Sequence, residues 1–161
     1  MAALAAVVNS NTAWQKVNHA LTDANPATQE AFRALKIYLA NQKLNLPLNI
    51  AFFTQADATV AATGTVLGTG APTVYAIYAK KGTVATNAWL KVSDDATGGA
   101  ATGTTRVAFP FTGAGDEKFF IDPEGLPFTL GIAVMSNTSF VGITVSTGAS
   151  TAMDGFVIYS V

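Results

Sequence analysis

The pattern of hydrophobic and polar positions changes near Pro47. Residues 10–44 contain no glycine and are rich in helix-forming residues, whereas residues 50–161 hold all 14 glycines and alternate β-branched and aromatic runs with turn clusters. We therefore expect a helical N-terminal arm over residues 1–47 and a β-domain over residues 48–161.

The first part of the arm has the spacing of a short amphipathic helix. Trp14, Val17 and Leu21 fall at positions i, i+3 and i+7, which share one helix face. This spacing predicts a helix over residues 13–22.

A second, longer helix is predicted from Pro26 to about Leu44. Asn25 is a favourable N-cap residue, and proline is well tolerated at the first helical position. The helix is amphipathic, with apolar residues on one face and basic residues on another. These residues are Phe32, Leu35 and Leu39 on the apolar face, and Arg33, Lys36 and Lys43 on the basic stripe.

The remainder of the chain reads as strands separated by glycine-rich turns, which is typical of an antiparallel β-sandwich or jelly-roll. No segment between the strands has the length and period of a crossover helix. The predicted strands are Ile50–Thr54, Thr73–Lys80, Ala88–Ser93, Thr105–Thr112, Lys118–Ile121, Phe128–Ser136, Val141–Val145 and Gly155–Ser160.

The strand Thr73–Lys80 is apolar on both faces, because Val74, Ala76 and Tyr78 alternate with other apolar residues. One face of a sandwich strand usually meets water. We expect either the arm or a partner to cover the outer face of this strand.

Composition excludes several functional classes. At 161 residues the chain suits one domain with an extension, and its formal charge of −1 lacks the basic footprint of a nucleic-acid binder. There is no cysteine for disulfides or thiolate metal sites. No apolar run approaches the ~20 residues needed to span a bilayer. Because no Lys or Arg precedes the short apolar run MAALAAVV, we expect synthesis in the cytoplasm without a signal peptide.

Few residues offer chemistry. His19 is the only histidine, and it lies in the arm, far in sequence from every acidic cluster, so no catalytic triad is expected. The carboxylate pairs lie in turns, where they favour tight turns rather than hydrolysis. A structural cation at Asp94, Asp95 and Thr97 is conceivable but not predicted. We expect no enzyme activity, no cofactor and no metal. The pairs are Asp94/Asp95, Asp116/Glu117 and Asp122/Glu124.

The order of features over residues 72–161 resembles the head decoration, or cement, proteins of tailed bacteriophages and related virion proteins. The segments that carry the resemblance are PTVYAIYAKK, NAWLKVSDDAT, TRVAFPFTGAGDEKFFIDPEGLPFTLGIAVMSNTS and DGFVIYSV. The resemblance implies a virion structural protein on the outer surface of the capsid, in homotrimers, whose N-terminal extension grips the major capsid protein. It carries no functional residues across.

The sequence leaves two alternatives open. The basic stripe of the second helix is either a docking stripe or an ordinary solvated face. A phage fibre or receptor-binding module that takes glycans on exposed aromatic residues is the competing function, with Trp89, Tyr75 and Phe140 as candidates. For the capsid function, the expected partner-binding residues are Trp14, Phe32, Arg33, Leu35, Lys36, Leu39 and Lys43.

Overall fold

The computed structural model describes residues 12–42, 48–55, 65–82, 87–97, 104–137 and 153–161. Residues 12–20 form a first helix, which a turn joins to helix α2. The other elements follow in chain order. They are α2 (Pro26–Asn41), β1 (Asn49–Gln55), β2 (Thr65–Thr69), β3 (Thr73–Lys81), β4 (Ala88–Asp94), β5 (Thr104–Phe111), β6 (Glu117–Pro127), β7 (Gly131–Asn137) and β8 (Met153–Ser160).

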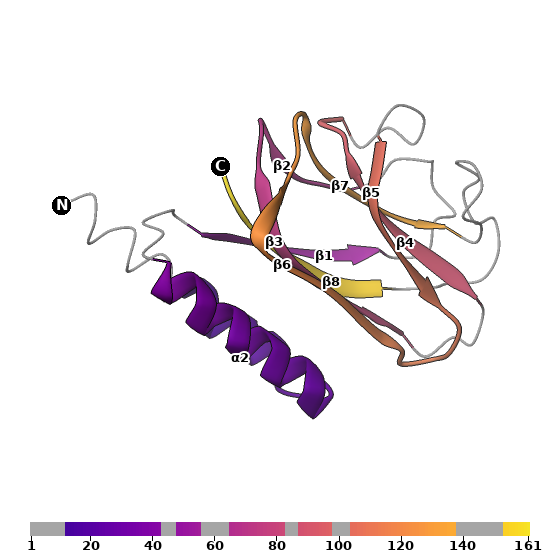
Figure 1. Ribbon diagram of the computed structural model, residues 1–161. Coiled ribbons are helices and arrows are strands. Elements are labelled where there is room, and N and C mark those ends of the chain that lie inside the picture. The colour runs from indigo at the N-terminus through magenta and orange to yellow at the C-terminus, as the bar shows by residue number, and fades with distance from the viewer. Residues whose placement is uncertain (1–11, 43–47, 56–64, 83–86, 98–103, 138–152) are drawn as a thin grey trace.

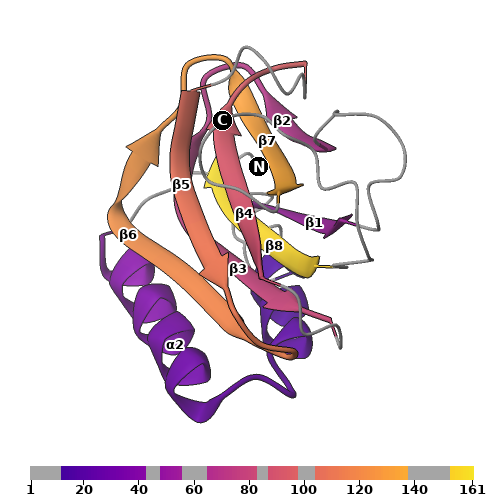
Figure 2. The same ribbon diagram turned by 90° about the vertical axis from the view of Figure 1, so that its right-hand side faces the viewer.

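The strands form two antiparallel sheets, so the predicted mainly β fold with an N-terminal helix is confirmed and is consistent with a β-sandwich. One sheet has the order β1-β8-β3-β6 and the other the order β2-β7-β4-β5 (Figures 1 and 2). Strands distant in sequence are thus neighbours, since β1 pairs with β8 along its whole length. Neither described helix has the length and apolar character needed to cross a membrane.

The two sheets enclose an apolar core. Inward-facing residues from both sheets alternate with outward-facing ones, as the pleat of a strand requires. The largest fully buried members of this core are Phe111, Phe128, Ile77, Leu90, Ile132 and Met153.

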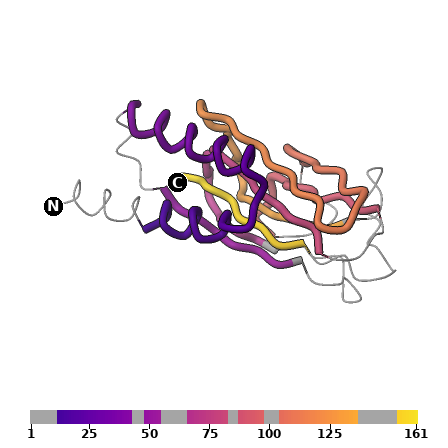
Figure 3. Tube along the Cα trace, turned by 90° about the horizontal axis from the view of Figure 1, so that it is seen from below, coloured from indigo at the N-terminus to yellow at the C-terminus, as the bar shows by residue number. Residues whose placement is uncertain are grey.

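The two helices form an antiparallel hairpin that lies on the outer face of the β1-β8-β3-β6 sheet (Figure 3). The Asn25 side chain accepts a hydrogen bond from the Ala27 N–H at 3.0 Å, which confirms the predicted N-cap of α2. A second apolar cluster joins the hairpin to the sheet and includes Trp14, Val17, Leu21, Phe32, Leu35 and Leu39.

The strand register places the outward side chains of this sheet in three rows that cross all four strands. The first row is polar, the second is aromatic and the third is aliphatic. The polar row is Thr54–Asp154–Lys80–Glu117, the aromatic row is Phe52–Phe156–Tyr78–Phe119 and the aliphatic row is Ile50–Ile158–Ala76–Ile121.

Phe32 of α2 packs on the aromatic row. Its ring centroid lies 5.4 Å from that of Phe156, 6.1 Å from Phe119 and 6.3 Å from Tyr78, and all three contacts are edge-to-face. Such aromatic pairs are worth about 0.5–1.5 kcal/mol beyond the area that they bury. Phe32 therefore anchors the hairpin to the sheet at three points.

This packing corrects the expectation of a docking arm. Trp14, Phe32, Leu35 and Leu39 are all at most 5% exposed, so their apolar face is not available to a capsid protein. The reason is the two-sided apolar strand β3, whose outer face the hairpin covers. The helical and β regions share one apolar cluster. The change in composition near Pro47 therefore marks a change of secondary structure and does not separate two independently packed regions.

The element boundaries mostly agree with the predicted ones. The first helix ends at residue 20 rather than 22, and α2 ends at Asn41 rather than near Leu44. Strand β2 was not predicted, and Val141–Val145 lies outside the described residues.

Two strands differ from their predicted bounds. The predicted turn after Ile121 is a bulge inside the longer strand β6, where the register with β3 shifts and Gly125 takes φ +89°. The strand predicted from Phe128 begins only at Gly131, because Thr129 and Leu130 form a bend.

We predict that Phe32→Ala lowers the free energy of unfolding of the whole domain by about 3–5 kcal/mol, the usual cost of removing a buried phenylalanine. Ile37→Ala is the matched control, because Ile37 lies on the same helix but is 56% exposed, and it should change stability by less than about 0.5 kcal/mol. Urea unfolding followed by circular dichroism measures both. If Phe32→Ala left the β-domain as stable as the control does, the hairpin would not belong to its core.

Candidate functional site

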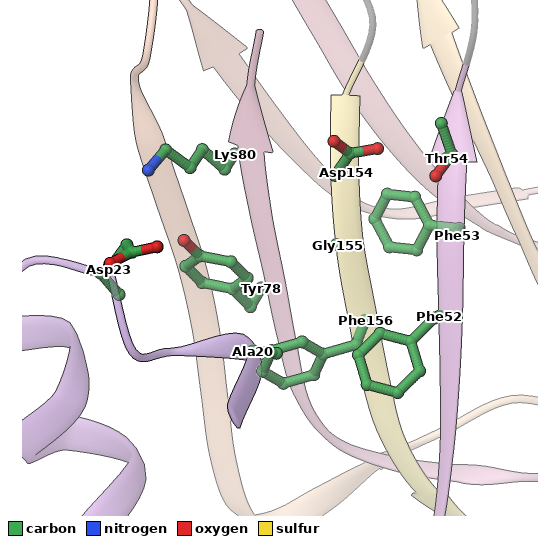
Figure 4. Close-up of a pocket in the computed structure, with 11 residues that line it drawn as sticks. Ala20, Asp23, Phe52, Phe53, Thr54, Tyr78, Lys80, Asp154, Gly155 and Phe156 are labelled. Atoms are coloured by element: carbon green, nitrogen blue, oxygen red, sulfur yellow. The ribbon is translucent and has the colours of Figure 1, made fainter. Parts of the chain in front are cut away.

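The candidate site is a cleft of about 310 Å³ where the turn of the helical hairpin meets the ends of β1, β8 and β3 (Figure 4). It lies where the aromatic and polar rows run side by side. The aromatic row supplies Phe52, Phe156 and Tyr78, and the polar row supplies Thr54, Asp154 and Lys80, while the hairpin contributes Asp23.

Gly155 contributes backbone to the cleft wall. A Cβ at this position would overlap the backbone oxygen of Tyr78 and lie 2.5 Å from the Phe53 ring. Only glycine therefore allows β8 to approach its neighbours this closely.

Glu117 fixes the hairpin turn over one end of the polar row. One carboxylate oxygen accepts the Asn25 N–H at 3.0 Å and the Thr28 hydroxyl at 3.5 Å. The other lies 3.5 Å from Lys80 Nζ. Burial, followed by the charge of Glu117 and a hydrogen bond to it, raises the pKa of Tyr78. Glu117 thus ties the hairpin to the sheet and balances the charge of Lys80.

Asp23 and Asp154 are the two carboxylates that the described residues contribute to the lining of the cleft. Asp23 and Asp154 are exposed, and neither forms an ion pair or a side-chain hydrogen bond with another described residue. Phe52, which also lines the cleft, is 50% exposed, and its ring centroid lies 5.8 Å from that of buried Phe156. The cleft combines an accessible aromatic edge with two negative charges.

The basic residues predicted for docking lie elsewhere. Arg33 and Lys36 line a groove of about 410 Å³ between the two helices, on the side away from the sheet. Arg33 Nη1 already pairs with Glu30 Oε2 at 2.7 Å, and both side chains are mostly exposed. Lys43 lies outside the described residues. Of the expected partner-binding set, Arg33 and Lys36 are thus the described residues that remain at the surface.

The residues considered for glycan binding are not brought together. Tyr75 is buried beneath the hairpin, where its hydroxyl lies 3.4 Å from Ser160 Oγ. Trp89 is half-buried on β4 of the other sheet, and Phe140 lies outside the described residues. Tyr75 and Trp89, the two candidates that the structure describes, therefore do not form an exposed pair of rings.

Asp116 and Asp122 bind nearby backbone N–H groups, as expected of turn carboxylates, whereas Glu117 and Glu124, the other members of these two pairs, accept hydrogen bonds from the helical hairpin. Asp116 Oδ2 accepts the N–H groups of Thr112 and Gly113, and these bonds hold the pKa of Asp116 below its usual range. Asp122 Oδ1 accepts the N–H groups of Glu124 and Gly125 within the β6 bulge. These carboxylates satisfy backbone donors that tight turns would otherwise leave unpaired.

Asp94 anchors the turn between β6 and β7. Its two oxygens accept the N–H groups of Thr129, Leu130 and Gly131 at 2.7–3.2 Å, together with the Thr129 hydroxyl at 2.8 Å. Asp95 Oδ1 similarly accepts the N–H and hydroxyl of Thr97. Asp94 and Asp95 thus bind backbone N–H groups and threonine hydroxyls. Among the described residues no group of three or more potential metal ligands occurs.

No family model, no curated protein and no solved structure matches this chain.

The sequence did not reveal the cleft. Its residues belong to predicted elements, but Phe52, Tyr78 and Asp154 are brought together only by the pairing of β1 and β3 with β8. The one local signal of a site in the sequence is the charged residue Asp154, which directly precedes the apolar run GFVIYSV.

We predict a pH-dependent contribution of Asp94 to stability. Burial raises the pKa of this carboxyl, but the hydrogen bonds from Leu130, Thr129 and Gly131 outweigh burial and lower the pKa overall. Because the pKa is lower in the folded than in the unfolded state, the stabilisation is present above about pH 4 and is lost as pH falls through the folded value.

Asp94→Asn should therefore cost about 1–3 kcal/mol at pH 7, because buried backbone donors lose a charged acceptor. The difference from the native chain should shrink as pH falls below about 4. Urea unfolding between pH 3 and 7 measures it, with exposed Asp154→Asn as the control. An equal cost of Asp94→Asn at both ends of this range would contradict the interpretation.

Proposed function

We propose that this chain is a non-enzymatic virion structural protein, a capsid decoration or cement protein that binds the outer surface of the major capsid protein and stabilises the head. The proposal starts from the resemblance of residues 72–161 to such proteins. It is supported by a sandwich fold of the kind that the resemblance implies, in which Asp94 and Asp116 hold turns and Glu117 holds a helix end.

The observation that carries the proposal is the edge strand β1. Within the described residues β1 hydrogen-bonds only to β8, so its other side lies at the edge of the sheet. The segment Asn49–Gln55 contains no proline and no charged residue, which are the usual devices that prevent an edge strand from pairing with another chain. Phe52 adds an accessible ring at the same edge.

An edge of this kind suits attachment to another protein rather than catalysis. Main-chain hydrogen bonds along a strand give affinity, and side chains at alternate positions give specificity. A protein that binds only the assembled head stabilises it by mass action, with no chemical step. Arg33 and Lys36 on the exposed hairpin groove would orient the molecule on an acidic patch, because exposed ion pairs contribute only about 0–1 kcal/mol.

We predict that Phe52→Lys weakens attachment to purified phage heads by about thirtyfold, as expected when a central aromatic contact worth about 2 kcal/mol is lost. Leu130→Lys is the matched control, because Leu130 is 55% exposed but lies in the bend just before β7, a strand of the other sheet. Cosedimentation of tagged protein with heads measures both, and unchanged melting shows that each variant folds. The proposal fails if the native chain does not sediment with heads.

We also expect the isolated protein to form a trimer, as the resemblance implies. The structure removes one argument for self-association, because the hairpin rather than another copy covers β3. A trimer requires a heterologous contact in which two different surfaces of the chain meet. Native mass spectrometry at micromolar concentration should show three chains, and a monomer both in solution and on particles would contradict this expectation.

A further inference from the structure

We infer that the cleft between the hairpin turn and strands β1, β8 and β3 receives an arginine side chain of the protein to which this chain attaches. The inference rests on the proposed function in so far as the partner is a protein. It goes beyond that function by assigning the recognised group and the residues that hold it.

Charge is the first argument. Lys80 is balanced by Glu117 at 3.5 Å, whereas Asp23 and Asp154 have no cationic partner among the described residues. The lining of the cleft therefore holds two carboxylates and one ammonium group that Glu117 already pairs, which leaves an excess of negative charge; Figure 4 shows Asp23 on the hairpin, and Asp154 and Lys80 on the sheet. A cation that enters between the two carboxylates supplies the missing partner.

Shape is the second argument. A volume of about 310 Å³ is at the lower end for small-molecule sites and suits a single side chain. The half-exposed Phe52, which packs on buried Phe156, provides accessible aromatic surface in the cleft that also holds the carboxylates. A guanidinium group is planar, stacks on aromatic faces and bonds carboxylates through several donors, whereas an ammonium group is a compact and strongly hydrated charge. Arginine fits these features better than lysine.

Position is the third argument. Thr54 on the edge strand lies directly opposite Asp154 in the register, and its side chain faces the cleft (Figure 4). A partner segment that runs along the side of β1 on which no described strand pairs projects alternate side chains onto this same face of the sheet. A long side chain opposite Thr54 then points toward Asp154, so strand pairing and the charged contact reinforce each other.

The test uses three blocked peptides as probes: acetyl-Gly-Arg-Gly-amide, its lysine analogue and its citrulline analogue. Citrulline has the shape of arginine without the charge. Binding to the full ¹⁵N-labelled chain is followed by amide shifts of Asp154, Gly155 and Thr54 at low salt. We expect the arginine peptide to shift these amides, the lysine peptide to bind several-fold more weakly and the citrulline peptide at least about tenfold more weakly.

Variants of the chain locate the effect. Asp23→Asn and Asp154→Asn should each weaken arginine-peptide binding about tenfold, and added salt should weaken binding to the native chain. Glu30→Gln removes an exposed carboxylate outside the cleft and should change nothing. Melting temperatures confirm that the variants fold. Equal binding of the citrulline peptide, or no effect of either aspartate variant, would overturn the inference.

The particle assay separates this inference from the proposed function. If Phe52→Lys releases the protein from heads while Asp154→Asn does not, the capsid role stands and the arginine contact is wrong. If the arginine peptide binds the cleft but the native chain never sediments with heads, the contact stands and the capsid role is wrong.

Discussion

The contact between Phe32 and the aromatic row of the sheet is the interaction on which the rest of the arrangement depends. Strands β3 and β8 are apolar on both faces. Exposing the outer side of the sheet to water would therefore lose the free energy gained by burying that apolar surface. Phe32 fixes the position of α2 on that face, because its ring contacts three of the four rings in the aromatic row. Once α2 is fixed at this point, the hairpin turn comes to lie over the polar row, and the cleft forms beside it.

Adjacent acidic residues can have unrelated roles, as Asp116 and Glu117 show. The Asp116 carboxylate bonds within its own turn, to Thr112 and Gly113, whereas Glu117 begins β6 and reaches a helix end 92 residues away in sequence. A pair that looks in sequence like a turn signal therefore includes a polar contact between hairpin and sheet. Lys80 lies opposite Asp154 in the register, but its ion pair is with Glu117, so neither Asp23 nor Asp154 has an ion-pair partner among the described residues.

Local patterns predicted the elements better than their assembly. The helix faces, the cap at Asn25 and most strands could be predicted because they depend on residues close in sequence. The five-residue strand β2 contains a glycine and a register shift, so its alternation is weak. The amphipathic face of α2 was identified correctly but assigned to the wrong partner, because an apolar stripe looks the same whether it packs on its own sheet or on another protein. The cleft depends on which strands pair, and that information is spread over the chain.

The position of β8 in the chain has a consequence for biosynthesis. The hairpin leaves the ribosome early, but its binding surface includes Phe156 and Ile158, which follow more than a hundred residues later. At typical elongation rates the apolar face of the hairpin waits on the order of ten seconds for that surface. During this interval Trp14, Phe32 and Leu35 are accessible to chaperones and to neighbouring nascent chains. The order of translation thus exposes, for a short time, the same apolar face that the finished fold conceals.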